Sequence, residues 1–115
     1  MSIQIVGGSV SPSTALSLNA QTGTTYTFVL TDANNTLVTA SNASAQTYTI
    51  PPNSSVAYPI GSQINIIAIG AGQVTIASDG TTVITGVGTK LAAQYAAATL
   101  ICTSSNNFTL IGYLA

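Results

Sequence analysis

Apolar and polar residues alternate along much of this chain, and the alternation predicts short β-strands. Every second residue of segment 25–30 is a large apolar one that we expect to face the core: Tyr26, Phe28 and Leu30. The same spacing recurs at Tyr48 and Ile50. Successive side chains of a strand point to opposite faces, so each segment is expected to bury one face and expose the other.

The most apolar segment, residues 63–69, predicts the central strand of the protein. From Ile64 to the end of this segment, every residue except Asn65 is apolar. Such a run is typical of a strand that is buried on both faces. Pro51 and Pro52 lie in the corner that precedes it, where they end any β-ladder because proline has no backbone donor. We expect the other strands to be arranged around this segment.

Turn-forming residues separate the apolar segments at short intervals. Asp79 and Gly80 favour a hairpin between the strands on either side, because a type I′ turn needs residues that tolerate a positive φ. The polar residues 104–107 are expected to join a C-terminal hairpin. Many short strands with a turn about every ten residues are typical of sandwiches and jelly rolls. The sequence therefore predicts an all-β, single-domain, antiparallel β-sandwich or jelly-roll-like fold.

The first residues of the chain, 1–24, are sparse in apolar side chains. Ile3, Ile5 and Val6 form a short candidate strand that ends at a pair of glycines. Two alternatives remain open for this strand. It completes the protein's own sandwich, or it adds an edge strand to a partner, where main-chain hydrogen bonds would supply affinity. We therefore treat residues 1–24 as a terminal strand or arm and a possible anchor, and residues 25–115 as the sandwich domain.

Charged residues are almost absent from this chain. They make up 3% of the 115 residues and consist of Asp32, Asp79 and Lys90, whereas about a quarter is usual. A net charge near zero favours association, and salt does not weaken uncharged contacts. The composition therefore favours a protein that works inside an assembly. It also argues against binding to nucleic-acid phosphates, and no segment reaches the roughly 18 apolar residues of a membrane-spanning helix.

The residue types that usually carry catalysis are missing. The chain has no histidine and no glutamate, so neither Cys102 nor any serine has an imidazole base. Glycoside hydrolysis needs two placed carboxylates, whereas Asp32 and Asp79 both lie in turn-forming sequences. The single cysteine excludes an internal disulfide, and its apolar surroundings favour a small buried hydrophobe. We expect no enzymatic activity, no cofactor and no metal site.

Some of the tyrosines are expected in the core, and others at the surface or at an interface. We expect Tyr26 and Tyr48 to fill the core, with their hydroxyls at its edge. Tyr58 stands beside Pro59 in a corner, which makes it the tyrosine that we expect to be exposed or at an interface. Tyrosine rings could also stack on the sugars of a receptor.

Three segments resemble, in the same order, a small β-domain of tailed-phage virion structural proteins: TIPPNSSVAYPIGSQINIIAIGAGQVTI, GTKLAAQYAAATLI and FTLIGYLA. That domain occurs in capsid decoration (cement), head-fibre and tail-fibre proteins. The resemblance covers residues 26–115. Near the end of the chain, Phe108 and Tyr113 stand where the family usually has a tryptophan and an acidic residue.

The resemblance implies a virion structural protein on the capsid surface. A fibre would need a shaft besides this domain, so a chain of 115 residues favours a decoration protein that binds the major capsid protein lattice as a homotrimer. The alternative is a head-fibre or tail-fibre module that recognises a host surface glycan. The expected interface residues come from the N-terminal strand, the proline corner and the C-terminal hairpin: Ile3, Ile5, Val6, Pro51, Pro52, Tyr58 and Tyr113.

Overall fold

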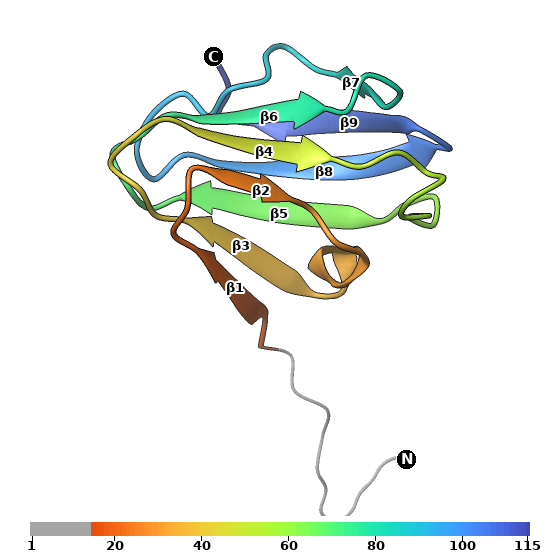
Figure 1. The fold of residues 1–115 in the computed structure, drawn as a ribbon, viewed down its shortest axis with the longest axis horizontal. Coiled ribbons are helices and arrows are strands. Elements are labelled where there is room, and N and C mark those ends of the chain that lie inside the picture. Colours follow the sequence, from red (N-terminus) through yellow and green to blue (C-terminus); the bar gives the residue numbers. More distant parts are fainter. Residues whose placement is uncertain (1–14) are drawn as a thin grey trace, which may run out of the picture.

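The computed structural model describes residues 15–115, and the fold in this range is all-β, as predicted (Figure 1). Its elements are nine strands and one short 3₁₀ helix: β1 (Ser17–Gln21), β2 (Thr25–Thr27), η1 (Leu30–Ala33), β3 (Thr36–Ala40), β4 (Gln46–Ile50), β5 (Gln63–Ala68), β6 (Val74–Ser78), β7 (Val83–Thr85), β8 (Ala97–Ser104) and β9 (Asn107–Gly112). The candidate strand at residues 3–6 lies outside the described residues. β1 falls within segment 1–24 and pairs with β3, so this part of the segment belongs to the fold.

The strands form two sheets that enclose one core. Six strands form the larger sheet in the order β1-β3-β5-β8-β9-β7, and three form the smaller one in the order β2-β4-β6. From β1 to β6 the chain alternates between the sheets, so each of β1 to β4 pairs in parallel with the strand two places later. The pairs β1–β2, β3–β4 and β5–β6 are thus successive coils of a short β-solenoid (Figure 1).

The strand pairing corrects the predicted antiparallel sandwich. Of the seven strand pairs in residues 15–115, five are parallel, and only β5–β8 and β8–β9 are antiparallel. Asp79 and Gly80 show why the prediction was wrong. The strands on either side of them, β6 and β7, lie in different sheets, so this turn carries the chain across the core and forms no hairpin. The same residue types form turns that join the strands of a hairpin and turns that carry the chain from one sheet to another. The C-terminal hairpin of β8 and β9 is confirmed.

The core fills the space between the two sheets. Tyr48 and Ile50 are both fully buried on the inner face of the smaller sheet, as their spacing predicted. The larger sheet contributes a matching set of side chains that are no more than 1% exposed: Val38, Ile64, Ile66, Leu100 and Leu110. The hydrophobic contact between these two layers is what holds the coils together.

β5 is central in the larger sheet, but it is not buried on both faces as expected. β3 and β8 pair with its two edges. Ile64, Ile66 and Ala68 are buried, whereas Asn65 and Ile67 are only half-buried. The reason is that the smaller sheet covers one face of the larger sheet and, among the described residues, no second layer of strands covers the other.

Candidate interaction surface

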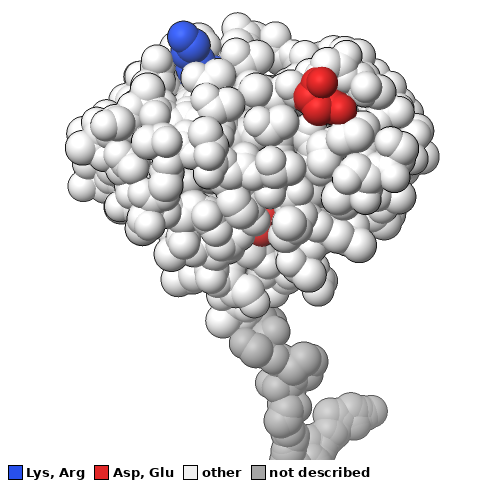
Figure 2. All heavy atoms as spheres, viewed as in Figure 1, with Lys and Arg blue, Asp and Glu red and all other residues white. Residues whose placement is uncertain are grey.

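The surface carries very little charge. Asp32 is 2% exposed, which leaves Asp79 and Lys90 as the charged side chains exposed to solvent. In Figure 2 the basic residue and the exposed acidic residue lie toward the edge that carries β6 and β7, and the rest of that face is uncharged apart from a small acidic patch. Contacts made by the β1 end of the molecule therefore depend on apolar and neutral polar groups.

Hydrogen bonds hold the buried carboxylate of Asp32. Its Oδ1 accepts a bond from Asn19 Nδ2 at 2.8 Å, and its Oδ2 accepts bonds from the Tyr26 hydroxyl at 2.7 Å and the Val29 amide at 2.9 Å. Burial, followed by the bond to Asp32, raises the pKa of Tyr26 to about 12. The Asn19 amide also donates to the Tyr26 oxygen at 2.9 Å. This network ties β1, β2 and η1 together, which gives Asp32 a structural role.

The proline corner at residues 51–58 turns two of its predicted interface side chains inward. Pro51 is buried and Tyr58 is only 6% exposed. The Tyr58 ring packs edge-on against Phe108, with 5.6 Å between ring centroids, and its hydroxyl donates to the Val29 carbonyl at 2.8 Å. The expected exposure of Tyr58 is therefore wrong, because the corner covers one end of the core. Burial raises the pKa of its hydroxyl.

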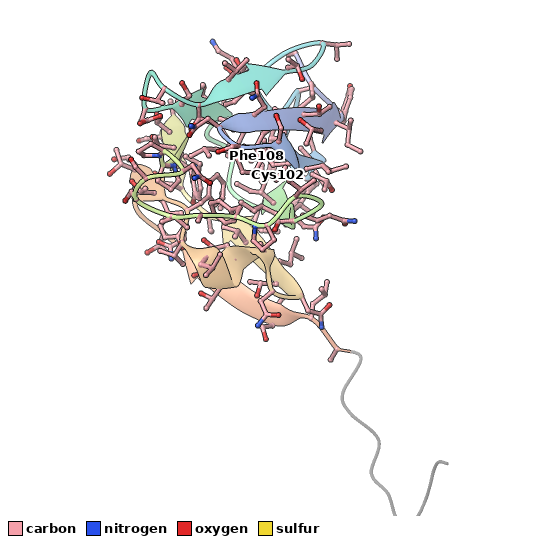
Figure 3. All side chains as sticks on the ribbon, turned by 90° about the vertical axis from the view of Figure 1, so that its right-hand side faces the viewer. Cys102 and Phe108 are labelled. Carbon is pink, nitrogen blue, oxygen red and sulfur yellow. The ribbon has the colours of Figure 1, made fainter. Side chains whose placement is uncertain are left out.

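Cys102 and Phe108 lie together on β8 and β9 beneath this corner (Figure 3). The Cys102 thiol is 2% exposed and lies 3.7 Å from the carbonyl oxygen of Tyr58. Burial raises the pKa of this thiol, so it stays protonated at neutral pH and is a poor nucleophile. The prediction of a small buried hydrophobe at this position is confirmed.

A shallow groove, which we call the η1 groove, crosses β1, η1 and the loop before β5. It consists of two adjoining hollows that share Thr31 and Asn34. The hollow next to β1 is lined further by Ser17, Leu18, Asn19, Asp32 and Thr36. The other is lined further by Leu30, Ala33, Pro59 and Ser62.

Large apolar side chains stand exposed along the η1 groove. Leu18 is 70% exposed and Leu30 is 51% exposed. Ile60 adjoins Pro59 in the chain and is 74% exposed. The expected inward position of Leu30 is wrong, because β2 ends at Thr27 and the chain has already turned into η1 at this residue. Sequence reasoning therefore missed the groove, which forms only where three separate segments meet.

The remaining predicted interface residues are not gathered at one place. Tyr113 is 65% exposed, as an interface residue must be, and Pro52 is half-buried. The Tyr113 amide donates to the Ala97 carbonyl at 3.2 Å, which places it at the opposite end of the β8–β9 hairpin from Tyr58. Ile3, Ile5 and Val6 lie outside the described residues, so their role stays a prediction.

Neither metal-ligand clusters nor a membrane-spanning helix are found within residues 15–115. In that range, no three or more His, Cys, Asp or Glu side chains group together so as to hold a metal ion. The same residues contain no helix that is long and apolar enough to cross a membrane. No protein-family model matches this chain, and searches of curated proteins and of solved structures found no match.

Proposed function

We propose that this chain is a non-enzymatic structural protein of a phage virion: a capsid decoration protein that binds the major capsid protein lattice at the capsid surface as a homotrimer. The observation that carries this proposal is the η1 groove, where exposed apolar side chains lie among polar groups that are neutral apart from the buried Asp32. Apolar side chains that cluster on a surface gain free energy when another protein covers them.

Attachment through the η1 groove would rest on a few anchors. Leu18 and Leu30 line the groove and each retain at least half of their surface in water, as does Ile60 next to the lining residue Pro59. Complete transfer of a side chain of this size from water is worth about 1.5–3 kcal/mol, so each anchor would supply part of that amount. A lattice offers many equivalent sites, and a homotrimer presents three copies of the groove with matching symmetry. Modest contacts then add up through multivalency.

The test compares groove variants with a variant of an even more exposed apolar residue elsewhere. Leu18→Ser and Leu30→Ser are the groove variants, because both side chains line the groove. Val87→Ser is the control, because Val87 is 90% exposed and follows β7, the edge strand at the far side of the larger sheet from β1. Particles that lack the protein are incubated with each variant and sedimented. We expect each groove variant to bind at least about tenfold more weakly than the control. Equal binding by all three would refute the groove as the attachment surface.

An alternative function, recognition of a host surface glycan, is favoured by a different pair of residues. Tyr95 is 66% exposed and Tyr113 is 65% exposed. Backbone bonds from Ala92 to Tyr113 at 3.0 Å and from Tyr113 to Ala97 at 3.2 Å place both tyrosines at the same end of β8 and β9. Their rings could stack on the apolar faces of sugars, as a receptor-binding module requires.

Two measurements separate the decoration protein from the glycan-binding module. Copy number per particle, from stained gels of purified virions, would be in the hundreds for a decoration protein and far lower for a fibre. The double variant Tyr95→Ala/Tyr113→Ala should leave particle binding unchanged if the chain is a decoration protein. If it abolishes attachment of particles to host cells, the glycan-binding function is favoured.

A further inference from the structure

The larger sheet has an outer face, which points away from the core. Its inner face carries Leu100 on β8 and Leu110 on β9, two buried residues that pair with each other. Successive residues of a strand point to opposite faces, so the next residues, Ile101 and Ile111, point outward. The smaller sheet covers the inner face, and within residues 15–115 no second layer of strands covers the outer face.

Large apolar side chains occur on both halves of the outer face. On the half formed by β1 and β3, Leu37 precedes the buried Val38 and pairs with Leu18. On the other half, Ile101 and Ile111 lie diagonally across the β8–β9 pair. Leu18 and Ile111 are each at least half exposed to water. The face thus carries one apolar patch on each side of β5, the β1–β3 patch and the β8–β9 patch.

No charged residue belongs to any of the six strands of this sheet. Asp32 lies in η1, Asp79 follows β6, and Lys90 follows β7. A charged group of a partner would lose its hydration on this face without gaining a counter-charge. The complementary surface must therefore be neutral as well. A second copy of this chain, with 3% charged residues, supplies such a surface.

Polar side chains on the outer face bond to one another. The Thr99 hydroxyl donates to the Asn65 side-chain oxygen at 2.7 Å. The hydroxyls of Thr85 and Thr109 lie 3.1 Å apart and share a hydrogen bond. Burying a polar group costs free energy unless it is hydrogen-bonded. Apolar side chains of another copy can therefore cover these three hydroxyls without leaving them unpaired.

The outer face is large enough for a stable contact. Its six strands have three to eight residues each. With about 4.8 Å between strands and about 3.3 Å per residue, they make a flat area of roughly 500 Å². Removing one copy from a ring of three exposes this face and the matching halves of its two neighbours, roughly 1,000 Å² in all, which is about the area that a specific interface needs.

We propose that copies of this chain associate through the outer face of the larger sheet, with the β1–β3 patch of one copy against the β8–β9 patch of the next. In a closed ring of three, each copy contacts its neighbours through two different patches, and this face carries one on each side of β5. The inference rests on the proposed homotrimer and names the surface that forms it. Sheets that pack face to face in β-sandwiches make the same kind of contact.

The mass of the protein in solution tests this proposal. Light scattering at micromolar concentration should give a trimer for the unchanged protein and a monomer for Ile111→Asp, because the variant puts an unpaired charge into the contact. This change corresponds to a dissociation constant raised at least about a hundredfold. Ile111 is half exposed, so a single copy can fold with the charge in water. Thr47→Asp is the matched control: it adds the same charge at an exposed position of β4 in the smaller sheet and should stay trimeric.

Two mass measurements would overturn the proposal: a monomeric unchanged protein, or an Ile111→Asp variant that stays trimeric. If that variant fails to fold, a soluble paramagnetic probe decides on the unchanged protein, because strong broadening of the Ile111 methyl signals in the assembled state refutes the interface. The groove variant Leu30→Ser separates this contact from capsid attachment, since it should remain a trimer while it binds particles weakly. An unchanged protein that is monomeric yet binds particles would overturn this proposal and leave capsid attachment standing.

Discussion

Replacing Ile66 by alanine is expected to lower the free energy of unfolding by about 3–4 kcal/mol. Ile66 is fully buried at the middle of β5, where it pairs with Val38 on β3 and with Ala98 on β8. The substitution removes three carbon atoms, which cost about 0.8 kcal/mol each in lost transfer free energy. A cavity adds to this cost, because Val38 and Ala98 are short side chains on paired strands and cannot move far enough to fill it.

Ile67 supplies the matched control for this experiment. It is the next residue on the same strand, it is only half-buried, and it faces away from the core. Ile67→Ala removes the same atoms and should cost less than about 1 kcal/mol. Urea unfolding of the three proteins, followed by circular dichroism and fitted with a common m-value, gives both differences. A cost for Ile66→Ala below about 1 kcal/mol, or equal to that for Ile67→Ala, would refute the central position of β5 in the core.

Four other predictions concern the tyrosines and attachment. Tyr26→Phe removes the hydroxyl that donates to Asp32 at 2.7 Å and should destabilise the fold by about 1–3 kcal/mol in urea unfolding. Tyr48→Phe should leave stability unchanged or raise it by up to about 1 kcal/mol, because the Tyr48 hydroxyl is buried without a hydrogen-bond partner in the described structure; a clear loss would contradict this. The pKa of Tyr26 is raised to about 12, so its contribution to stability should be constant below pH 10, the usual tyrosine value, and should be lost as pH rises toward 12; the raised pKa values of Tyr48 and Tyr58 act in the same direction. A urea midpoint that does not change over that range would contradict this pKa shift. Washing particles in about 1 M salt should leave the protein bound, because only three charged side chains are present to be screened; release by salt alone would contradict uncharged attachment.

Local features of the chain were predictable where the alternation of apolar and polar residues decides them alone. Tyr48 and Ile50 lie on one face of β4 and are buried, because any strand with that alternation buries its apolar face. The hairpin of β8 and β9 was also predictable, since a short polar loop joins two apolar segments that pair directly with each other. The near absence of charge is a property of composition and holds for any fold.

The buried Asp32 and the η1 groove could not be predicted in this way. The partners of Asp32 include Asn19 on β1 and Tyr26 on β2, two strands that belong to different sheets. A carboxylate in a turn-forming sequence is usually exposed, so its burial depends on donors that only the folded chain brings within reach. The groove likewise needs Leu18, Leu30 and Pro59 to meet from three segments.

The sequence by itself determined where most of the strands lie. The tertiary structure decided which strands pair and which apolar side chains stay in water, as at Leu30. The turn at Asp79 and Gly80 has the composition of a hairpin, yet it carries the chain from one sheet to the other. Local backbone preferences set the tightness of such a turn. The direction in which the chain continues depends on where apolar surface remains to be covered. Here the strands alternate between the two sheets, and the apolar inner face of each sheet covers that of the other.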